Sequence, residues 1–326
     1  MQHVKLQPFN IKLKRPQVLF LGNGLFHGDI DWDEFINSCL RSTLNKEEWD
    51  AHFGAIPYSI RANVGCAFND NQRRKQYTDL LKKLQKENNI YSKQYPILDQ
   101  LLKLPFDAVI TTNYTYQIEN SLDPEFVKKS DRTLCKNYTC TTLPNKNDRD
   151  SVFLLHTFNR VNGVDVWHPH GESRLKSSIV LTHDEYGRLS SEIRGYFKEI
   201  SNRYDECAEE LQYNTWMDYI ITGDVYVLGY GANFAEFDFW WLLGRRMREA
   251  GSVGRIIFYE PLREIDKPKH FALSQSGVTV ETLGFTFTDK YADYTAFYTA
   301  ALKNITNQLS PSITQEKNPA RQLASV

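Results

Sequence analysis

The stretch Val166-Trp167-His168-Pro169-His170-Gly171-Glu172 joins the end of an expected strand to a sharp turn that carries two imidazoles. Gly171 has no Cβ, so the chain can turn directly after His170. Proline fixes the φ angle between the two histidines, and we expect that both rings cannot easily point inward. We predict that His170 is a catalytic base, for reasons that lie elsewhere in the chain, and that His168 is an ordinary hydrogen-bonded histidine. The alternative is that His170 is also an ordinary loop histidine.

An asparagine-glycine pair precedes this stretch. Asn162-Gly163 lies between two apolar runs, residues 152–156 and 164–168, which is a strong signal for a β-hairpin. The second arm would deliver the two histidines. A further short strand is expected over residues 179–182, with a helix directly after it.

Small or polar residues stand at or near the ends of three other apolar runs, which span residues 16–22, 107–115 and 225–231. These small or polar segments are Gly22-Asn23-Gly24, Thr111-Thr112-Asn113 and Gly229-Tyr230-Gly231. Buried parallel strands read as continuous apolar runs, and open α/β sheets bind ligands at the carboxyl ends of their strands. Further strands are expected over 255–260 and 278–282, and further helices over 190–218, from Phe239, and over 262–274 and 290–309. The sequence therefore predicts an α/β fold with a Rossmann-like, largely parallel sheet.

Asn113 can offer both a donor and an acceptor at such a strand end. The alternative is that its side chain only caps the expected helix over residues 116–122. Gly22 and Gly24 could bring backbone N–H groups close to a phosphate. The dinucleotide fingerprint of dehydrogenases is incomplete, because Gly28 stands one residue late and no ribose-binding acid follows on a suitable strand. The sequence therefore argues against a dehydrogenase.

One domain is expected over residues 16–309. Residues 31–104 have the pattern of a helical insertion between two core strands, with an amphipathic, basic helix over 71–88. Residues 124–150 are polar and turn-rich, which predicts a surface excursion. A polar, disordered tail is expected over 310–326.

The chain has 326 residues and a net charge of −1, so it has no overall attraction for nucleic acid or anionic membranes. No run reaches the roughly 20 apolar residues that span a bilayer, and the polar N-terminus lacks the apolar centre of a secretory signal. We expect a cytoplasmic protein that contacts no membrane, and nucleic acid only through a partner. The cysteines are scattered, which fits reduced thiols and no metal site; they are Cys39, Cys66, Cys135, Cys140 and Cys207.

Four segments resemble, in their order and spacing, the sirtuin-like NAD-binding domain. They are Gly22-Asn23-Gly24, Thr112-Asn113, His170-Gly171, and Gly229-Tyr230-Gly231 with Asp238 downstream. The segment from Val180 to Tyr186 also resembles the piece that follows the His-Gly pair in bacterial sirtuin-like proteins. The resemblance spans about residues 16–285.

This resemblance implies roles for the residues that carry it. Asn113 would orient a water molecule or the nicotinamide ribose, and His170 would be the general base. The residues that bind NAD would be Gly22, Asn23, Gly24, Thr112, Gly229, Gly231 and Asp238.

Sirtuin deacylases carry a zinc module of two Cys-x-x-Cys pairs, which this chain lacks. The resemblance is therefore to the bacterial branch, whose members hydrolyse NAD, often as anti-phage effectors that deplete the cell's NAD. It implies that NAD is the substrate and that no metal is needed. A homo-oligomer or a complex with a co-encoded regulatory protein would control the activity.

Two positions depart from the bacterial pattern: Thr115 stands where Asp is usual, and Gly231 where Ser is usual. These departures favour an alternative, a non-catalytic sirtuin-fold subunit that binds NAD or ADP-ribose and docks on a partner protein.

NAD hydrolysis needs a held ribose, one positioned water and a base. The transition state resembles an oxocarbenium ion, as in glycoside hydrolysis. A histidine with an ordinary pKa of ~6.5 can take a proton near neutral pH. Glu172 follows His170 by two residues, so in an extended segment it would share a face with that ring and could orient it.

Overall fold

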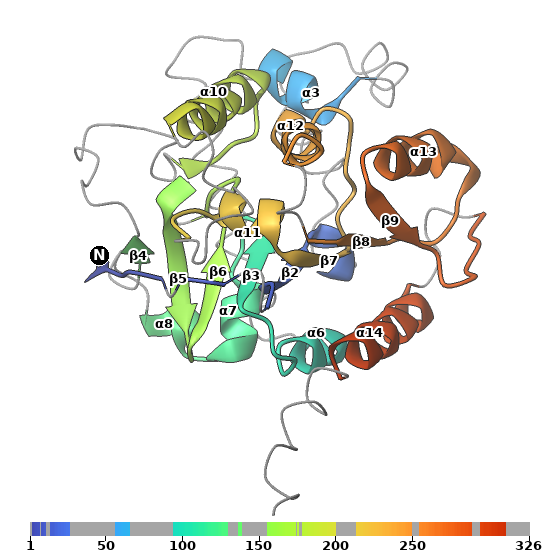
Figure 1. Ribbon diagram of the computed structural model, residues 1–326, viewed down its shortest axis with the longest axis horizontal. Coiled ribbons are helices and arrows are strands. Elements are labelled where there is room, and N and C mark those ends of the chain that lie inside the picture. Colours follow the sequence, from blue (N-terminus) through green and yellow to red (C-terminus); the bar gives the residue numbers. More distant parts are fainter. Residues whose placement is uncertain are drawn as a thin grey trace, which may run out of the picture.

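The fold is built on one large sheet (Figure 1). The computed structural model describes residues 2–6, 8–10, 14–26, 56–65, 94–129, 136–138, 155–173, 175, 178–199, 213–249, 254–288 and 294–310. Within these residues the sheet has nine strands, in the order β1-β4-β5-β6-β3-β2-β7-β8-β9. The strands are β1 (Gln2–His3), β2 (Gln17–Leu21), β3 (Ala108–Thr111), β4 (Lys136–Tyr138), β5 (Thr157–Val161), β6 (Val164–Trp167), β7 (Asp224–Leu228), β8 (Ile256–Tyr259) and β9 (Val278–Glu281).

Six neighbouring strands, from β6 to β9, are parallel to one another. The prediction of a Rossmann-like, largely parallel sheet is therefore confirmed. Numbered along the chain, these six strands lie in the order 3-2-1-4-5-6, which is the order of a doubly wound sheet. The order reverses between β2 and β7, and ligands of such sheets bind beyond the carboxyl ends of the strands at this point.

The central strand β2 shows why these residues form a buried strand. Its side chains alternate between the two faces of the sheet: Val18 and Phe20 belong to one core cluster, and Leu19 and Leu21 to the other. Because helices cover both faces, both sets must be apolar, and the strand reads as a continuous apolar run.

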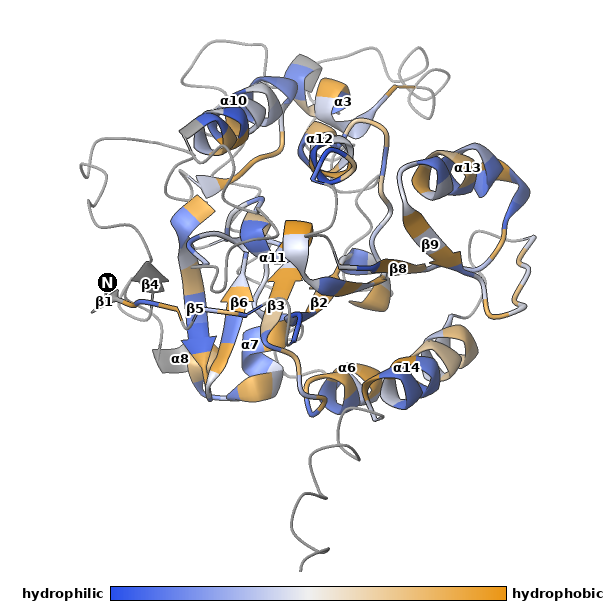
Figure 2. Ribbon diagram, in the orientation of Figure 1, coloured by the Kyte–Doolittle hydropathy of each residue, from blue (hydrophilic) through white to orange (hydrophobic). Residues whose placement is uncertain are grey.

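Two layers of helices enclose the sheet (Figure 1). On one side lie α3 (Tyr58–Gly65), α10 (His183–Glu199), α11 (Trp216–Thr222), α12 (Phe237–Arg246) and α13 (Lys267–Gln275); on the other lie α6 (Pro96–Leu101), α7 (Gln117–Leu122), α8 (Phe126–Lys129) and α14 (Thr295–Leu309). β3 is orange in Figure 2, whereas much of α10 and α13 is blue, as expected when apolar strands lie beneath amphipathic helices.

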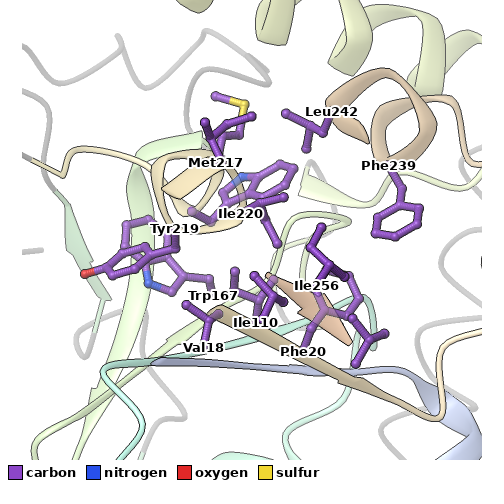
Figure 3. Packing of buried hydrophobic residues seen from close by; sticks show 14 of the residues in the cluster. Val18, Phe20, Ile110, Trp167, Met217, Tyr219, Ile220, Phe239, Leu242 and Ile256 are labelled. Carbon is purple, nitrogen blue, oxygen red and sulfur yellow. The ribbon is translucent and has the colours of Figure 1, made fainter. Parts of the chain in front are cut away.

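Figure 3 shows the core between the sheet and its first helical layer. Val18, Ile110 and Ile256 of the strands face Ile220 of α11 and Leu242 of α12. The expected helix from Phe239 therefore buries one face against the sheet.

The predicted hairpin is confirmed at its turn and wrong in the placement of its first arm. Asn162 and Gly163 both have positive φ, 49° and 84°, as a two-residue type I′ turn requires. Such a turn forces the flanking residues to pair directly, and Val161 pairs with Val164. The first arm is therefore β5, and not residues 152–156.

Three other expectations are corrected. Residues 179–182 form no strand; Val180 is instead fixed by its N–H, which donates to the His170 carbonyl at 2.9 Å. The expected helix 190–218 is not continuous: α10 ends at Glu199, and Trp216 begins the new helix α11 behind a capping box of Thr215 and Asp218. The expected excursion over 124–150 contains β4, which joins the sheet beside β5.

Several predictions fall on residues outside the description. Of the expected insertion, residues 56–65 and 94–104 are described, and both contain a helix. The basic helix over 71–88, the five cysteines and residues 311–326 lie outside the described residues. No helix in the described part of the chain is long and apolar enough to cross a membrane.

Candidate active site

The predicted site residues follow four adjacent parallel strands. Gly22, Asn113, His170 and Gly229 come directly or shortly after β2, β3, β6 and β7. Because parallel strands all end at the same edge of a sheet, these residues gather at the carboxyl edge, on both sides of the point where the strand order reverses.

His170 is buried, with 3% of its surface exposed, and both ring nitrogens have partners. Its Nε2 lies 2.8 Å from Oδ2 of Asp238, in the first turn of α12. Its Nδ1 lies 3.4 Å from the hydroxyl of Tyr186 in α10. The prediction that His170 and Asp238 belong to one site is thus matched by a direct contact between them.

The two contacts differ in strength. An ionised carboxylate only accepts hydrogen bonds, so it fixes a proton on Nε2. The hydrogen bond at Nδ1 is long, 3.4 Å against the usual 2.7–3.2 Å. Nδ1 is therefore the nitrogen that can take up a further proton. Burial lowers the pKa of His170, but the charge and hydrogen bond of Asp238, with a smaller contribution from Glu236, outweigh it and raise the pKa above 6.5.

The ring of His170 is placed by a glycine turn. Gly171 has φ +93°, and its N–H donates to the carbonyl of His168 at 2.9 Å. A Cβ at this position would lie 2.1 Å from the carbonyl oxygen of Ser178, closer than atoms can approach. The predicted sharp turn after His170 therefore requires glycine.

Tyr186 is also part of a second contact. Its hydroxyl lies 2.6 Å from the hydroxyl of Tyr58 in α3, and the Tyr58 hydroxyl lies 3.0 Å from Oε1 of Glu236. Oε2 of Glu236 accepts the N–H of Asn233 at 3.1 Å. Burial raises the pKa of Glu236 above 4.5, although the positive charge of His170 opposes the shift. Ionisable groups from three helices, α3, α10 and α12, and from Glu236 just before α12 thus lie around His170.

His168 is buried to the same degree, with 3% exposed, so the expectation that Pro169 keeps the two rings from both pointing inward is wrong. Its Nδ1 donates to the carbonyl of Asn113 at 2.8 Å, and its Nε2 lies 2.7 Å from Oε1 of Glu119. The residues after His168 form a turn rather than an extended strand. The two rings therefore diverge into different buried surroundings.

Glu172 does not orient His170. Its Oε2 accepts hydrogen bonds from the Tyr116 hydroxyl at 3.0 Å and from Nδ2 of Asn159 at 3.4 Å. The expectation assumed an extended backbone, but the positive φ of Gly171 breaks the alternation of side chains. Glu172 therefore shares Asn159 with Glu119 and lies with the partners of His168.

Asn113 is buried, and its side chain does not cap the following helix. The N-cap of α7 is Tyr116, which has no side-chain cap. Among the described residues no partner lies within hydrogen-bonding distance of Nδ2 of Asn113. Oδ1 of Asp238 likewise has no hydrogen-bond partner among the described residues. One buried donor and one buried acceptor thus stand at the carboxyl edge of the sheet.

The predicted glycines pack against one another across the strand reversal. A Cβ on Gly22 would lie 2.4 Å from the carbonyl oxygen of Gly229, and one on Gly24 would lie 2.9 Å from the same atom. The N–H of Gly24 donates to that carbonyl at 2.7 Å. Close approach of two backbones is one reason for glycine here.

The remaining predicted positions have simpler surroundings. Asn23 begins the short 3₁₀ helix η1 (Asn23–Phe26), and Thr112 is half-buried. Gly231 is exposed, and a Cβ there would meet nothing within 4 Å. The backbone therefore leaves room for the serine usual in the bacterial pattern. The hydroxyl of Thr115 donates to the side-chain carbonyl of Gln117.

Three residues next to His170 were not predicted to take part in the site. Tyr186 and Glu236 stand in segments already linked to the site by their sequence, but Tyr58 lies in the expected insertion and carries no local signal. Only the packing of α3 against α10 and the contact of Tyr58 with Glu236, just before α12, bring it near His170. No group of three or more His, Cys, Asp and Glu side chains arranged to hold a metal occurs among the described residues.

A comparison with protein families adds independent evidence. Residues 107–279, more than half of the chain, match the family model of the SIR2-like domain. The matched range contains Asn113, both histidines, Gly229 and Asp238. No curated protein matches the chain significantly.

Proposed function

The chain belongs to the SIR2-like domain family, and from this premise we propose that it is an NAD glycohydrolase that releases nicotinamide and ADP-ribose. Domains of this family are often NAD-dependent enzymes. Membership of the family supports an NAD-related function. The chemistry of the carboxyl edge supports this specific reaction.

The observation that carries the proposal is the contact between His170 and Asp238 at the strand reversal. It combines a buried base with a carboxylate whose second oxygen has no partner among the described residues. The unpartnered Nδ2 of Asn113 adds a donor. A ribose offers hydroxyl groups that both donate and accept, so the donor and the acceptor both suit this ligand.

In the reaction, a bond forms between the water oxygen and C1′ of the ribose. The C1′–N1 bond breaks, and its electron pair neutralises the nicotinamide ring. Asn113 would hold the water or a ribose hydroxyl through Nδ2. Nδ1 of His170 would take the proton of the water, while Asp238 stabilises the resulting imidazolium. Such a base typically contributes roughly 10²- to 10⁴-fold to the rate.

The test is nicotinamide release from NAD by the purified full chain, compared with Asn113→Ala and His170→Ala. Tyr213→Phe is a suitable control, because the Tyr213 hydroxyl contacts Thr222 at 2.6 Å and lies outside this network. Loss of turnover in both site variants, with the control unchanged, would support the proposal. No release by the wild type, alone or with its cellular activator, would refute it.

One observation favours the alternative of a non-catalytic subunit that binds NAD or ADP-ribose and docks on a partner protein. Both ring nitrogens of His170 contact other side chains, so a water molecule would have to compete with the Tyr186 hydroxyl for Nδ1. A titration with NAD separates the two functions: saturable binding without nicotinamide release would support the subunit.

A hydrolase of NAD without control would poison its own cell. We therefore propose that a homo-oligomer or a co-encoded regulatory protein controls the activity. From the resemblance to the bacterial branch we further propose a role in anti-phage defence, in the cytoplasm. Co-expression with neighbouring gene products, followed by measurement of particle mass and of NAD in infected cells, tests this. A constant monomer with constitutive activity would contradict it.

A further inference from the structure

We propose that Glu236, Tyr58 and Tyr186 are positioning residues that set the protonation state of His170 by sharing one proton with it along a buried chain of hydrogen bonds. The chain runs from Oε1 of Glu236 to the Tyr58 hydroxyl at 3.0 Å, to the Tyr186 hydroxyl at 2.6 Å, and to Nδ1 of His170 at 3.4 Å. Asp238 holds the far side of the ring at 2.8 Å.

The chain links elements that are remote in sequence. Glu236 precedes α12, Tyr58 belongs to α3, Tyr186 to α10, and His170 follows β6. Glu236, Tyr186 and His170 are buried, and in such surroundings a hydrogen bond is electrostatically stronger than in water. The segment between β2 and β3 thus supplies one link, Tyr58, to a site that the sheet alone does not complete.

The geometry permits two arrangements with the same number of protons. In the first, neutral Glu236 donates to Tyr58, Tyr58 donates to Tyr186, and Tyr186 donates to the lone pair of Nδ1. In the second, His170 donates from Nδ1 to Tyr186, Tyr186 to Tyr58, and Tyr58 to the Glu236 carboxylate. Each hydroxyl gives one proton and receives one, so the conversion moves one positive charge onto His170 and leaves one negative charge on Glu236.

Other ionisable groups also face Glu236 and must be considered. Tyr114 lies in the loop after β3, Tyr58 in α3, Tyr186 in α10 and Asp238 in α12. His170 follows β6, and Tyr230 follows β7. The tyrosines stay neutral near pH 7, because burial raises the pKa of each of them. Glu236 and the His170–Asp238 pair are therefore the groups that exchange the proton.

This inference deepens the proposed function, since it concerns the base of the same reaction, but its main test needs no turnover. In ¹⁵N-histidine-labelled full-length protein without ligand, the nitrogen shifts of His170 are followed against pH; His170→Gln identifies the signal. Glu236→Gln is expected to lower the midpoint of His170 by about one pH unit, a tenfold loss of proton affinity. Tyr186→Phe, which leaves the Glu236–Tyr58 contact in place, should have a similar effect.

The double variant decides between the chain and a simple effect of charge through space. If the chain transmits the coupling, Glu236→Gln has little further effect in the Tyr186→Phe background. An undiminished effect there would overturn the proposal, as would an unchanged titration in both single variants. Tyr58→Phe repeats the test at a second link if Tyr186→Phe does not fold, and Tyr213→Phe is the matched control for loss of a buried hydroxyl.

Kinetics add a second measurement where NAD is hydrolysed. Tyr186→Phe should lower kcat several-fold with little change in KM and should shift the acidic limb of the kcat profile in the same direction as the His170 titration. An unchanged pH profile with an equal loss at every pH would contradict the positioning role. If no hydrolysis is found at all, the nitrogen titration still decides the inference, and only the proposed function fails.

Discussion

Two buried histidine–carboxylate pairs stand two residues apart, and they differ in what binds the second nitrogen of each ring. In the pair His168–Glu119, at 2.7 Å, the second nitrogen donates to the carbonyl of Asn113. In the pair His170–Asp238, at 2.8 Å, it meets a tyrosine hydroxyl at 3.4 Å. A carbonyl can only accept a hydrogen bond, so Nδ1 of His168 keeps its proton. A hydroxyl can both donate and accept a hydrogen bond, so Nδ1 of His170 can gain and lose a proton.

Burial and a contact with a carboxylate are therefore not enough to single out one histidine as a base. His168 links the backbone of Asn113 to Glu119 of α7, whereas His170 keeps one nitrogen available for proton transfer. The following predictions test this division between a structural pair and a chemical pair.

The largest effect is expected from His170→Ala. Removing the base should lower the rate of nicotinamide release by roughly 10²- to 10⁴-fold, while the circular dichroism spectrum remains that of the folded protein. The measurement is the initial rate at saturating NAD, with Tyr213→Phe as control. A variant with the full wild-type rate would assign the base to another residue.

His168→Ala should act on stability rather than directly on chemistry. It removes the histidine from the buried Glu119 side chain, which keeps its hydrogen bond from Nδ2 of Asn159, and breaking a buried pair typically costs about 3–5 kcal/mol. Urea unfolding measures the loss. In a double-mutant cycle with Glu119→Ala, the combined loss should be clearly smaller than the sum of the single losses; additive losses would show that the two side chains do not act as a pair.

Gly171→Ala should disturb both pairs, because the N–H of Gly171 closes the turn that carries both histidines by donating to the carbonyl of His168. A positive φ at a non-glycine residue costs about 1–3 kcal/mol, and the contact with the Ser178 carbonyl adds to it. Gly163→Ala is the matched control: its φ is +84°, but a Cβ there meets nothing within 4 Å. The free energy of unfolding should fall more for Gly171→Ala; equal losses would remove the steric argument.

The smallest effect is a dependence of stability on pH. The folded-state pKa of His170 is raised above 6.5, so its stabilising contribution is complete below pH 6.5 and is lost as the pH rises through the folded value. The pKa of Glu236 is also raised above its ordinary 4.5. Its stabilising contribution is therefore likewise complete below pH 4.5 and lost as the pH rises through the folded value. Stability should fall by at most about 1.4 kcal/mol per pH unit for each proton. His170→Gln should flatten the slope above pH 6.5; an identical slope would contradict it.

Much of the fold could be predicted from local patterns. Continuous apolar runs identified β2, β3 and β7, because strands covered on both faces carry apolar residues throughout. Asn162-Gly163 predicted its turn correctly, since both residues tolerate positive φ. The first arm of the hairpin and the strand expected over 179–182 were wrong, because apolar residues alone do not show whether a segment pairs within a sheet.

The place of the candidate site residues was predictable where they lie close after a strand. Gly22 and Gly229 follow their strands directly and Asn113 lies two residues after β3, and parallel strands bring their carboxyl ends together whatever lies between them in sequence. The surroundings of the histidines were not predictable in this way. The roles expected for Pro169 and Glu172 assumed an extended backbone, and one positive φ at Gly171 was enough to overturn them.

The class of fold, the sheet edge that carries the candidate site residues and the turn after His170 could thus be inferred from the amino-acid sequence. These features depend on short-range properties: side-chain alternation, apolar runs and glycine. Which carboxylate each histidine contacts depends instead on the packing of segments that are remote in sequence. Asp238 comes from α12, Glu236 from the residue before it, Tyr186 from α10, Tyr58 from α3 and Glu119 from α7. The packing of these helices on opposite faces of the sheet gives two neighbouring imidazoles different partners.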